Sequence, residues 1–235
     1  MDSKFEQHLS ISYFAPLAQE LAQAGYRAVA INPRGAGAST GPLAALTLDT
    51  LTADVAGVIT ALHCAPVHIV GHAFGSRMAR CLAIDYPHLV RSVIVLAGGG
   101  SGETDAEMRA AIHTWFRADA TEAECIEALG AMLAKSSSAQ AVWQQVKRWP
   151  AAAAAQLGVM QTTRRNDWRG TPGNAPYLLV QGDEDRLAPP SSGRALRDRY
   201  GNRIHLVEIP HAGHVLLPEQ PEAVADAVIT FLREH

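Results

Sequence analysis

The chain has 235 residues, of which 48% are hydrophobic, and a formal net charge of −3 at pH 7. This length and composition predict one large domain that can bury a sizeable core, with room for an inserted segment. The acidic balance, with no basic cluster longer than Arg164-Arg165, argues against nucleic acid as a partner, because a phosphate backbone needs a concentrated cationic face.

Short apolar runs alternate with longer amphipathic segments, which is typical of an α/β fold with a mostly parallel sheet and helices on both faces. Strands are predicted at residues 27–32, 67–71, 92–97, 177–181 and 203–209. Helices are predicted between them at residues 13–24, 50–62, 74–86, 191–200 and 221–233.

Residues 103–169 interrupt this alternation, because they are helical by periodicity throughout. We therefore predict a core made of residues 1–100 and 171–235, with a helical cap inserted at residues 101–170. Pro150 is expected to open one cap helix, and Thr121 with Glu124 resembles a capping box for another.

All four tryptophans of the chain lie in the cap segment. An apolar helical cap over the carboxyl ends of the strands would make a pocket for a small, mostly apolar ligand. The residues expected to contact that ligand are Trp115, Trp143, Trp149 and Met160. The alternative, that these side chains only pack the cap helices together, stays open for each of them.

Residues 69–76, with the sequence Ile-Val-Gly-His-Ala-Phe-Gly-Ser, read as a strand, a sharp turn between glycines and a helix. This is the layout of a G-x-S-x-G nucleophile elbow with Ala73 in the place of the serine. Alanine has no group that could attack a carbonyl, so an acyl-enzyme mechanism is excluded for this sequence. The backbone N–H of Phe74 would still point at an oxyanion from the start of the helix.

An acidic stretch follows at residues 182–185 and an imidazole follows in residues 210–214, which gives the order elbow, acid, histidine. From about Ser12 to His235 the chain resembles the α/β-hydrolase superfamily. The resemblance implies that Asp185, ahead of Asp183, is the acid and that His214 is the base. His211 and His72 are weaker candidates, the first a solvated loop residue and the second packed beside the turn.

The loop at residues 32–41 resembles the loop that follows the strand before the elbow in this family. We expect its glycines to serve a turn and not to bind phosphate, because no Lys-Ser or Lys-Thr follows them. Ser39 and Ser76 are the hydroxyls nearest in sequence to these loops. We expect Ser76 to face away from Ala73, and neither serine is a convincing substitute nucleophile.

The same resemblance places a further strand between residues 27–32 and the elbow strand, and its loop would supply half of the oxyanion hole. Residues 1–11 are too polar for that role. We therefore expect a chain that lacks the family's amino-terminal strands, either by loss or by a late recorded start. The expected result is an open gap in the sheet and low solubility.

Three functions follow: an ester or carbonyl hydrolase by ancestry, an enzyme that uses His214 and Asp185 as a general base without covalent catalysis, or a non-catalytic binding protein. An engineered and a natural origin of Ala73 are both open. Cys64, Cys81 and Cys125 match no metal-binding spacing, so buried thiols are expected, with no metal or cofactor. With no apolar stretch of signal-peptide or membrane-span length, we expect a cytoplasmic protein without a membrane partner, and the oligomeric state is unknown.

Overall fold

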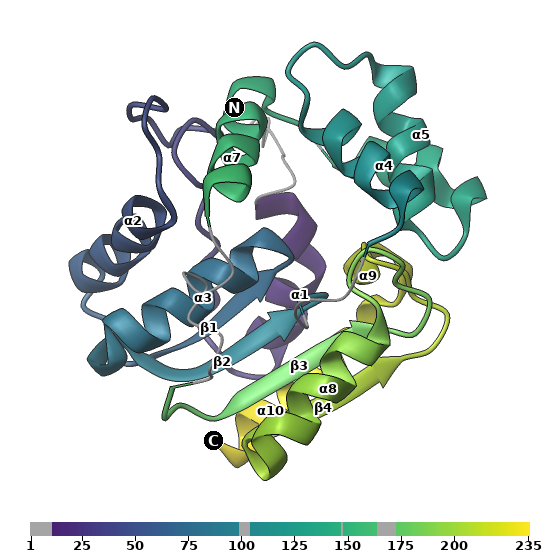
Figure 1. Cartoon of the computed structure of the whole chain (residues 1–235). Helices are drawn as coiled ribbons and strands as arrows, with labels where there is room; N and C mark the ends of the chain where they lie inside the picture. Colours follow the sequence, from purple (N-terminus) through teal and green to yellow (C-terminus); the bar gives the residue numbers. More distant parts are fainter. Residues whose placement is uncertain (1–10, 99–103, 147, 164–172) are drawn as a thin grey trace.

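The computed structural model describes residues 11–98, 104–146, 148–163 and 173–235 (Figure 1). Four strands form one parallel sheet in the order β1-β2-β3-β4. Their bounds are Val67–His72 for β1, Val90–Leu96 for β2, Tyr177–Gly182 for β3 and Ile204–Ile209 for β4. The central strands β2 and β3 are almost wholly buried, because helices cover both faces of the sheet. The predicted α/β architecture is confirmed.

The helices that flank the sheet begin and end within three residues of the predicted positions. They are α1 (Ile11–Gln23), α2 (Leu48–Ala61), α3 (Phe74–Asp85), α8 (Pro190–Tyr200) and α10 (Pro221–Glu234). A short helix, α9 (Leu216–Glu219), precedes the last of them. Single turns of 3-10 helix lie at Pro87–Leu89, Ser136–Ser138 and Gly201–Arg203.

Alternate side chains of the strands enter two separate hydrophobic clusters. Ile94 and Leu178 belong to a cluster on one face that also contains residues of α1 and α10. Their neighbours Val93 and Leu179 belong to a cluster on the other face with residues of α2 and α3, against which α8 packs. This alternation is the period of two of a β-strand, and it fixes which helices cover which face.

Four helices lie between β2 and β3 along the chain: α4 (Ala106–Phe116), α5 (Glu122–Met132), α6 (Ala139–Gln145) and α7 (Pro150–Thr162). Pro150 opens α7 and the predicted capping box of Thr121 and Glu124 opens α5. Figure 1 shows α4 and α5 together, and α7 packs against α4. Val159 of α7 is buried against Leu48 and Phe74, which ties this helix to the core.

The strand predicted at residues 27–32 is wrong. This segment forms no ladder with β1 or any other described strand, and β1 is an edge of the four-stranded sheet. An extended segment becomes a strand only when a neighbour takes its backbone hydrogen bonds. The direct pairing of residues 28–31 with residues 68–70 that would have closed the gap does not form.

The three cysteines are free thiols, two of them buried and Cys64 partly buried. Within the described ranges, no helix combines the length and the apolar character that crossing a bilayer requires.

Candidate active site

A sharp turn joins β1 to α3 and carries Ala73 at its apex. The backbone of Ala73 has φ 48° and ψ −110°, a conformation that L-residues rarely adopt. Its N–H donates to the carbonyl of Leu96 at 2.9 Å, which fixes the turn to β2. A side chain on Gly71 would place its Cβ 2.4 Å from the carbonyl oxygen of Gly75, so the two arms of the turn can approach this closely only because residue 71 is glycine.

The first residues of α3 supply backbone donors at this turn. The N–H of Phe74 is among the first in the helix, so no earlier helical carbonyl accepts it. The positive end of the helix dipole lies at the same place. Ser76 does not face away as expected: its hydroxyl donates to the Ala73 carbonyl at 2.6 Å and it lines the pocket. This bond helps to hold the turn.

Asp185 follows β3 and is 2% exposed. One carboxylate oxygen, Oδ1, accepts the backbone N–H groups of Leu187 and Ala188 at 2.9 and 2.8 Å. The other, Oδ2, accepts the side-chain amide of Gln181 at 3.2 Å. Three donors therefore orient this carboxylate before histidine is considered.

His214 completes the arrangement as predicted, with its Nδ1 2.9 Å from Oδ2 of Asp185 and its side chain 7% exposed. The hydrogen-bond network makes Nδ1 the donor, which leaves Nε2 as an acceptor. His211, by contrast, is 77% exposed and lies 3.5 Å from Glu184. The structure therefore brings Asp185 and His214 together and leaves His211 outside.

His72 packs beside the turn, as expected, and bonds to the histidine loop. Its Nε2 lies 2.8 Å from the carbonyl oxygen of His214, so it acts as the donor there. Its ring lies 4.6 Å from that of Tyr13, centroid to centroid. Burial, and then the neighbouring His214, lower the pKa of His72 to about 3, which keeps its ring neutral at neutral pH.

Two polar residues of the site escaped the sequence analysis. Gln181 is the one polar side chain of β3, next to its last residue, and that position was a usable signal. Glu219 gave no signal: its carboxylate accepts the N–H of Gly213 at 2.8 Å and that of Ala134 at 2.7 Å. Burial raises the pKa of Glu219, against the effect of these donors. The carboxylate thus ties the histidine loop to the end of α5.

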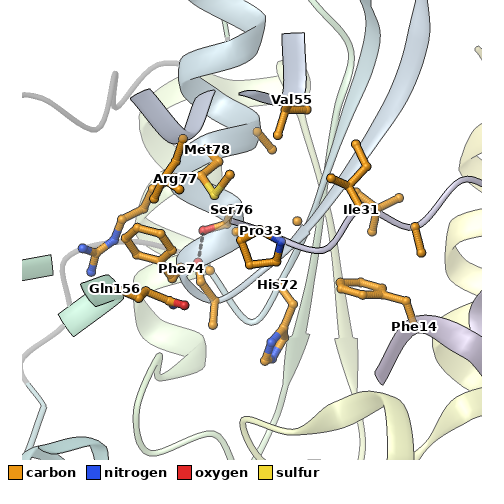
Figure 2. Close-up of a pocket in the computed structure, with 18 of the residues that line it drawn as sticks. Phe14, Ile31, Pro33, Val55, His72, Phe74, Ser76, Arg77, Met78 and Gln156 are labelled. Atoms are coloured by element: carbon orange, nitrogen blue, oxygen red, sulfur yellow. Dashed lines mark hydrogen bonds between the residues drawn. The ribbon is translucent and has the colours of Figure 1, made fainter. Parts of the chain in front are cut away.

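A cavity of about 1130 Å³ opens beside the turn, where His72 and Phe74 line it (Figure 2). Ala73 and His214 line it as well. Three of the four predicted ligand contacts line it, namely Trp115, Trp149 and Met160. Their side chains come from α4, α7 and the residue before α7, so the helices between β2 and β3 form one wall.

The fourth of these residues, Trp143, does not line this cavity. Its ring packs edge to face against Trp115 at 6.2 Å, and its indole N–H donates to Glu122 at 3.0 Å. It lines a separate, smaller hollow. Trp168 falls outside the described residues.

The cavity also reaches the gap beside β1. Ile31 on one side and Val70 on the other both line it, as does Phe14 of α1. Most other lining side chains are apolar, as Figure 2 shows around Val55 and Met78. Among the described residues, no group of three or more His, Cys, Asp or Glu side chains is placed to hold a metal ion.

A family model described as "Alpha/beta hydrolase family" matches residues 8–227. The chain is 30% identical over 223 residues to "Putative non-heme bromoperoxidase BpoC" of Mycobacterium tuberculosis, an alignment that covers 88% of this chain and 83% of that protein. The crystal structure of BpoC matches with a TM-score of 0.74 and 25% identity, covering 92% of this chain and 84% of that one.

Two further proteins extend the comparison. The chain is 27% identical over 235 residues to 2-(acetamidomethylene)succinate hydrolase of Mesorhizobium japonicum, covering 93% of this chain and 82% of that protein. An esterase from Exiguobacterium antarcticum matches with a TM-score of 0.80 over 95% of this chain and 88% of that chain. At 16% identity the esterase shares the fold alone.

Proposed function

Because the chain belongs to the alpha/beta hydrolase family, we propose that it hydrolyses a small ester or related carbonyl compound without forming an acyl-enzyme. In this reaction His214 activates a water molecule. The observation that carries the proposal is the buried hydrogen bond of 2.9 Å between His214 and Asp185 beside Ala73.

The chemistry follows from the tautomer of His214. With Nδ1–H donated to Asp185, Nε2 accepts a proton from water as the hydroxide attacks the carbonyl carbon. The N–H of Phe74 and the positive end of α3 stabilise the negative oxygen that develops. The imidazolium then returns its proton to the leaving oxygen, and the acid and the alcohol are released.

The expected rate is modest. A positioned general base contributes about 10²- to 10⁴-fold, and a missing oxyanion donor reduces the rate by about 10²- to 10³-fold.

A second candidate is non-catalytic binding of the same class of compound, which the absence of a nucleophile at Ala73 favours. A third description, a serine hydrolase in which alanine has replaced the nucleophile, predicts that serine restores activity.

One kinetic comparison separates the three. The wild-type chain, His214→Ala and Ala73→Ser are assayed with short p-nitrophenyl esters, with His211→Ala as a matched control because this exposed histidine lies on the same loop. Wild-type hydrolysis that falls at least about 10²-fold in His214→Ala and is unchanged in His211→Ala is the expected result.

The other outcomes assign the other functions. An inactive wild type with an active Ala73→Ser variant identifies a hydrolase that lacks only its nucleophile. Inactivity of both, in chains that circular dichroism shows to be folded, leaves the binding protein and rejects the proposal.

A further inference from the structure

Gln181 lies in β3, where all six residues are buried, and its own exposed fraction is 0%. Its amide nitrogen, Nε2, contacts two oxygen atoms: Oδ2 of Asp185 at 3.2 Å and the carbonyl oxygen of Ala188. Both oxygens are acceptors, so the amide atom beside them has to be the NH₂ group, and this settles the orientation of the amide. Gln181 therefore donates two hydrogen bonds to the acid loop, which we define as residues 182–189.

The amide of Gln181 and the ring of His214 share one oxygen atom of Asp185. Nδ1 of His214 lies 2.9 Å from the same Oδ2 that accepts Nε2 of Gln181. The other oxygen, Oδ1, accepts the backbone N–H groups of Leu187 and Ala188. Each carboxylate oxygen thus has two donors, which matches the two lone-pair sites that it offers. Because donors occupy every site, Asp185 acts only as an acceptor, and the proton between it and His214 stays on Nδ1.

This use of a glutamine has a cost that the sheet itself does not require. The other amide atom, Oε1, is buried and has no hydrogen-bond partner in the part of the chain that the structure describes. The atom faces α8, where a Cβ on Gly193 would lie 3.6 Å from it. A buried acceptor without a donor lowers stability, and the apolar Leu179 and Val180 in the same strand carry no such cost. What the nitrogen does for the carboxylate, and not the packing of β3, therefore explains Gln181.

We propose that Gln181 is a positioning residue, which holds Asp185 so that His214 keeps its proton on Nδ1 and its Nε2 as an acceptor. Without this amide the backbone donors fix only Oδ1, and His214 alone has to fix Oδ2. The carboxylate is then less well aligned with Nδ1, and the tautomer with the proton on Nε2 becomes populated. That tautomer cannot accept a proton from water. The proposal deepens the proposed function and rests on it for the effect on catalysis, but not for the tautomer.

NMR spectroscopy on the isotope-labelled full chain tests the tautomer without any substrate. In the wild type we expect one tautomer of His214, with the proton on Nδ1. We also expect a nuclear Overhauser effect between this proton and the side-chain amide protons of Gln181, because both donors lie on one oxygen atom. A proton on Nε2, or the absence of this effect, overturns the proposal whether or not any variant folds.

Gln181→Met removes both donors and keeps an apolar side chain of similar length. We expect both tautomers of His214 in this variant. We also expect kcat for short p-nitrophenyl esters to fall by about 10- to 100-fold while KM stays within about 2-fold, because the base acts in the transition state. The matched control is Gln140→Met, which changes an exposed glutamine of α6 outside the cavity and should leave the tautomer and kcat unchanged.

The outcomes separate this inference from the proposed hydrolysis. A Gln181→Met variant that keeps the single Nδ1–H tautomer overturns the inference, even if the variant is less stable, because its glutamine then serves only the fold. A change of tautomer with unchanged turnover would refute the general base and leave the inference standing. If the wild type hydrolyses no ester, the proposed function fails, and the tautomers of His214 in the two proteins still decide the role of Gln181.

Discussion

Ala73 keeps the positive φ of the turn, although its side chain has no group that could act as a nucleophile. Its φ of 48° costs of the order of 1–3 kcal/mol for a residue with a side chain, and the surrounding contacts must hold it. The Leu96 carbonyl and the Ser76 hydroxyl provide those contacts. The backbone of the turn can therefore accommodate a serine, which differs from alanine by one oxygen. Ala73→Ser thus tests the chemistry without a change in backbone conformation.

His72 should make the protein sensitive to mild acid. In the unfolded chain its pKa returns to about 6.5, whereas burial holds it near 3 in the folded protein. Between these values only the unfolded chain binds the proton, so the free energy of unfolding falls as the pH drops from about 6.5 to about 3. At about 1.4 kcal/mol per pKa unit, the loss is of the order of a few kcal/mol.

Urea unfolding at a series of pH values measures this loss. The variant His72→Gln keeps a donor for the His214 carbonyl but has no proton to bind, so its stability should depend less on pH over the same interval. An equally steep dependence in both proteins would assign the acid sensitivity to other groups.

At the scale of single residues, the sequence predicts those site residues that stand in a fixed order along the chain. Asp185 and His214 come after strands, in a fixed order behind the turn, and they meet at hydrogen-bonding distance. Glu219 could not be predicted, because its partners are backbone N–H groups of residues 134 and 213, and backbone donors look alike in every sequence. That Trp143 does not line the cavity could not be read from the sequence, because helical periodicity does not tell which side of a helix meets the cavity.

At the scale of elements, the end of α5 and the histidine loop act as one unit. The N–H of His214 donates to the carbonyl of Met132 at 2.8 Å, and Gly213 has room for no Cβ, since one would lie 2.6 Å from that same oxygen. Glu219 bonds to both segments. The position of the base thus depends on a helix inserted far away in the chain.

Glu219→Ala should lower the free energy of unfolding by about 2–4 kcal/mol, because it leaves two backbone N–H groups without an acceptor. Glu219→Gln should lose less, since one oxygen remains. Urea denaturation measures both, with Glu222→Ala as the control: that exposed glutamate lies in the first turn of α10, where its loss costs less than about 1 kcal/mol. Equal losses for Glu219→Ala and Glu222→Ala would contradict the assigned role.

Element positions followed well from apolar periodicity, because each flanking helix has one buried face and each central strand is mostly apolar. The segment at residues 27–32 has the same apolar pattern as a strand but no partner on β1. Periodicity reports that a segment is suited to a sheet. Whether it becomes a strand depends on a neighbour elsewhere in the chain.

In the whole molecule, the strands of the sheet differ in how far neighbouring elements cover them. β3 lies between β2 and β4 under helices on both faces, whereas β1 has the cavity on its free side. The low solubility expected from such an edge stays a prediction. The cavity that would hold the ligand and the gap beside the sheet are continuous, so a bound molecule would also affect the stability of β1.

The free side of β1 should be visible as a difference in hydrogen-exchange rates within one sheet. Alternate amides of a parallel strand point to opposite sides, so about half of those in β1 face the cavity and should exchange in minutes. Amides of β2 and β3 should exchange only when the whole chain unfolds, and those of β4, the other edge, should show the same alternation as β1. Exchange followed by NMR measures each amide separately. Uniform protection along β1 would mean that another segment covers it in solution. Fast and slow exchange at alternate amides would show, residue by residue, that the outer side of β1 is open to water.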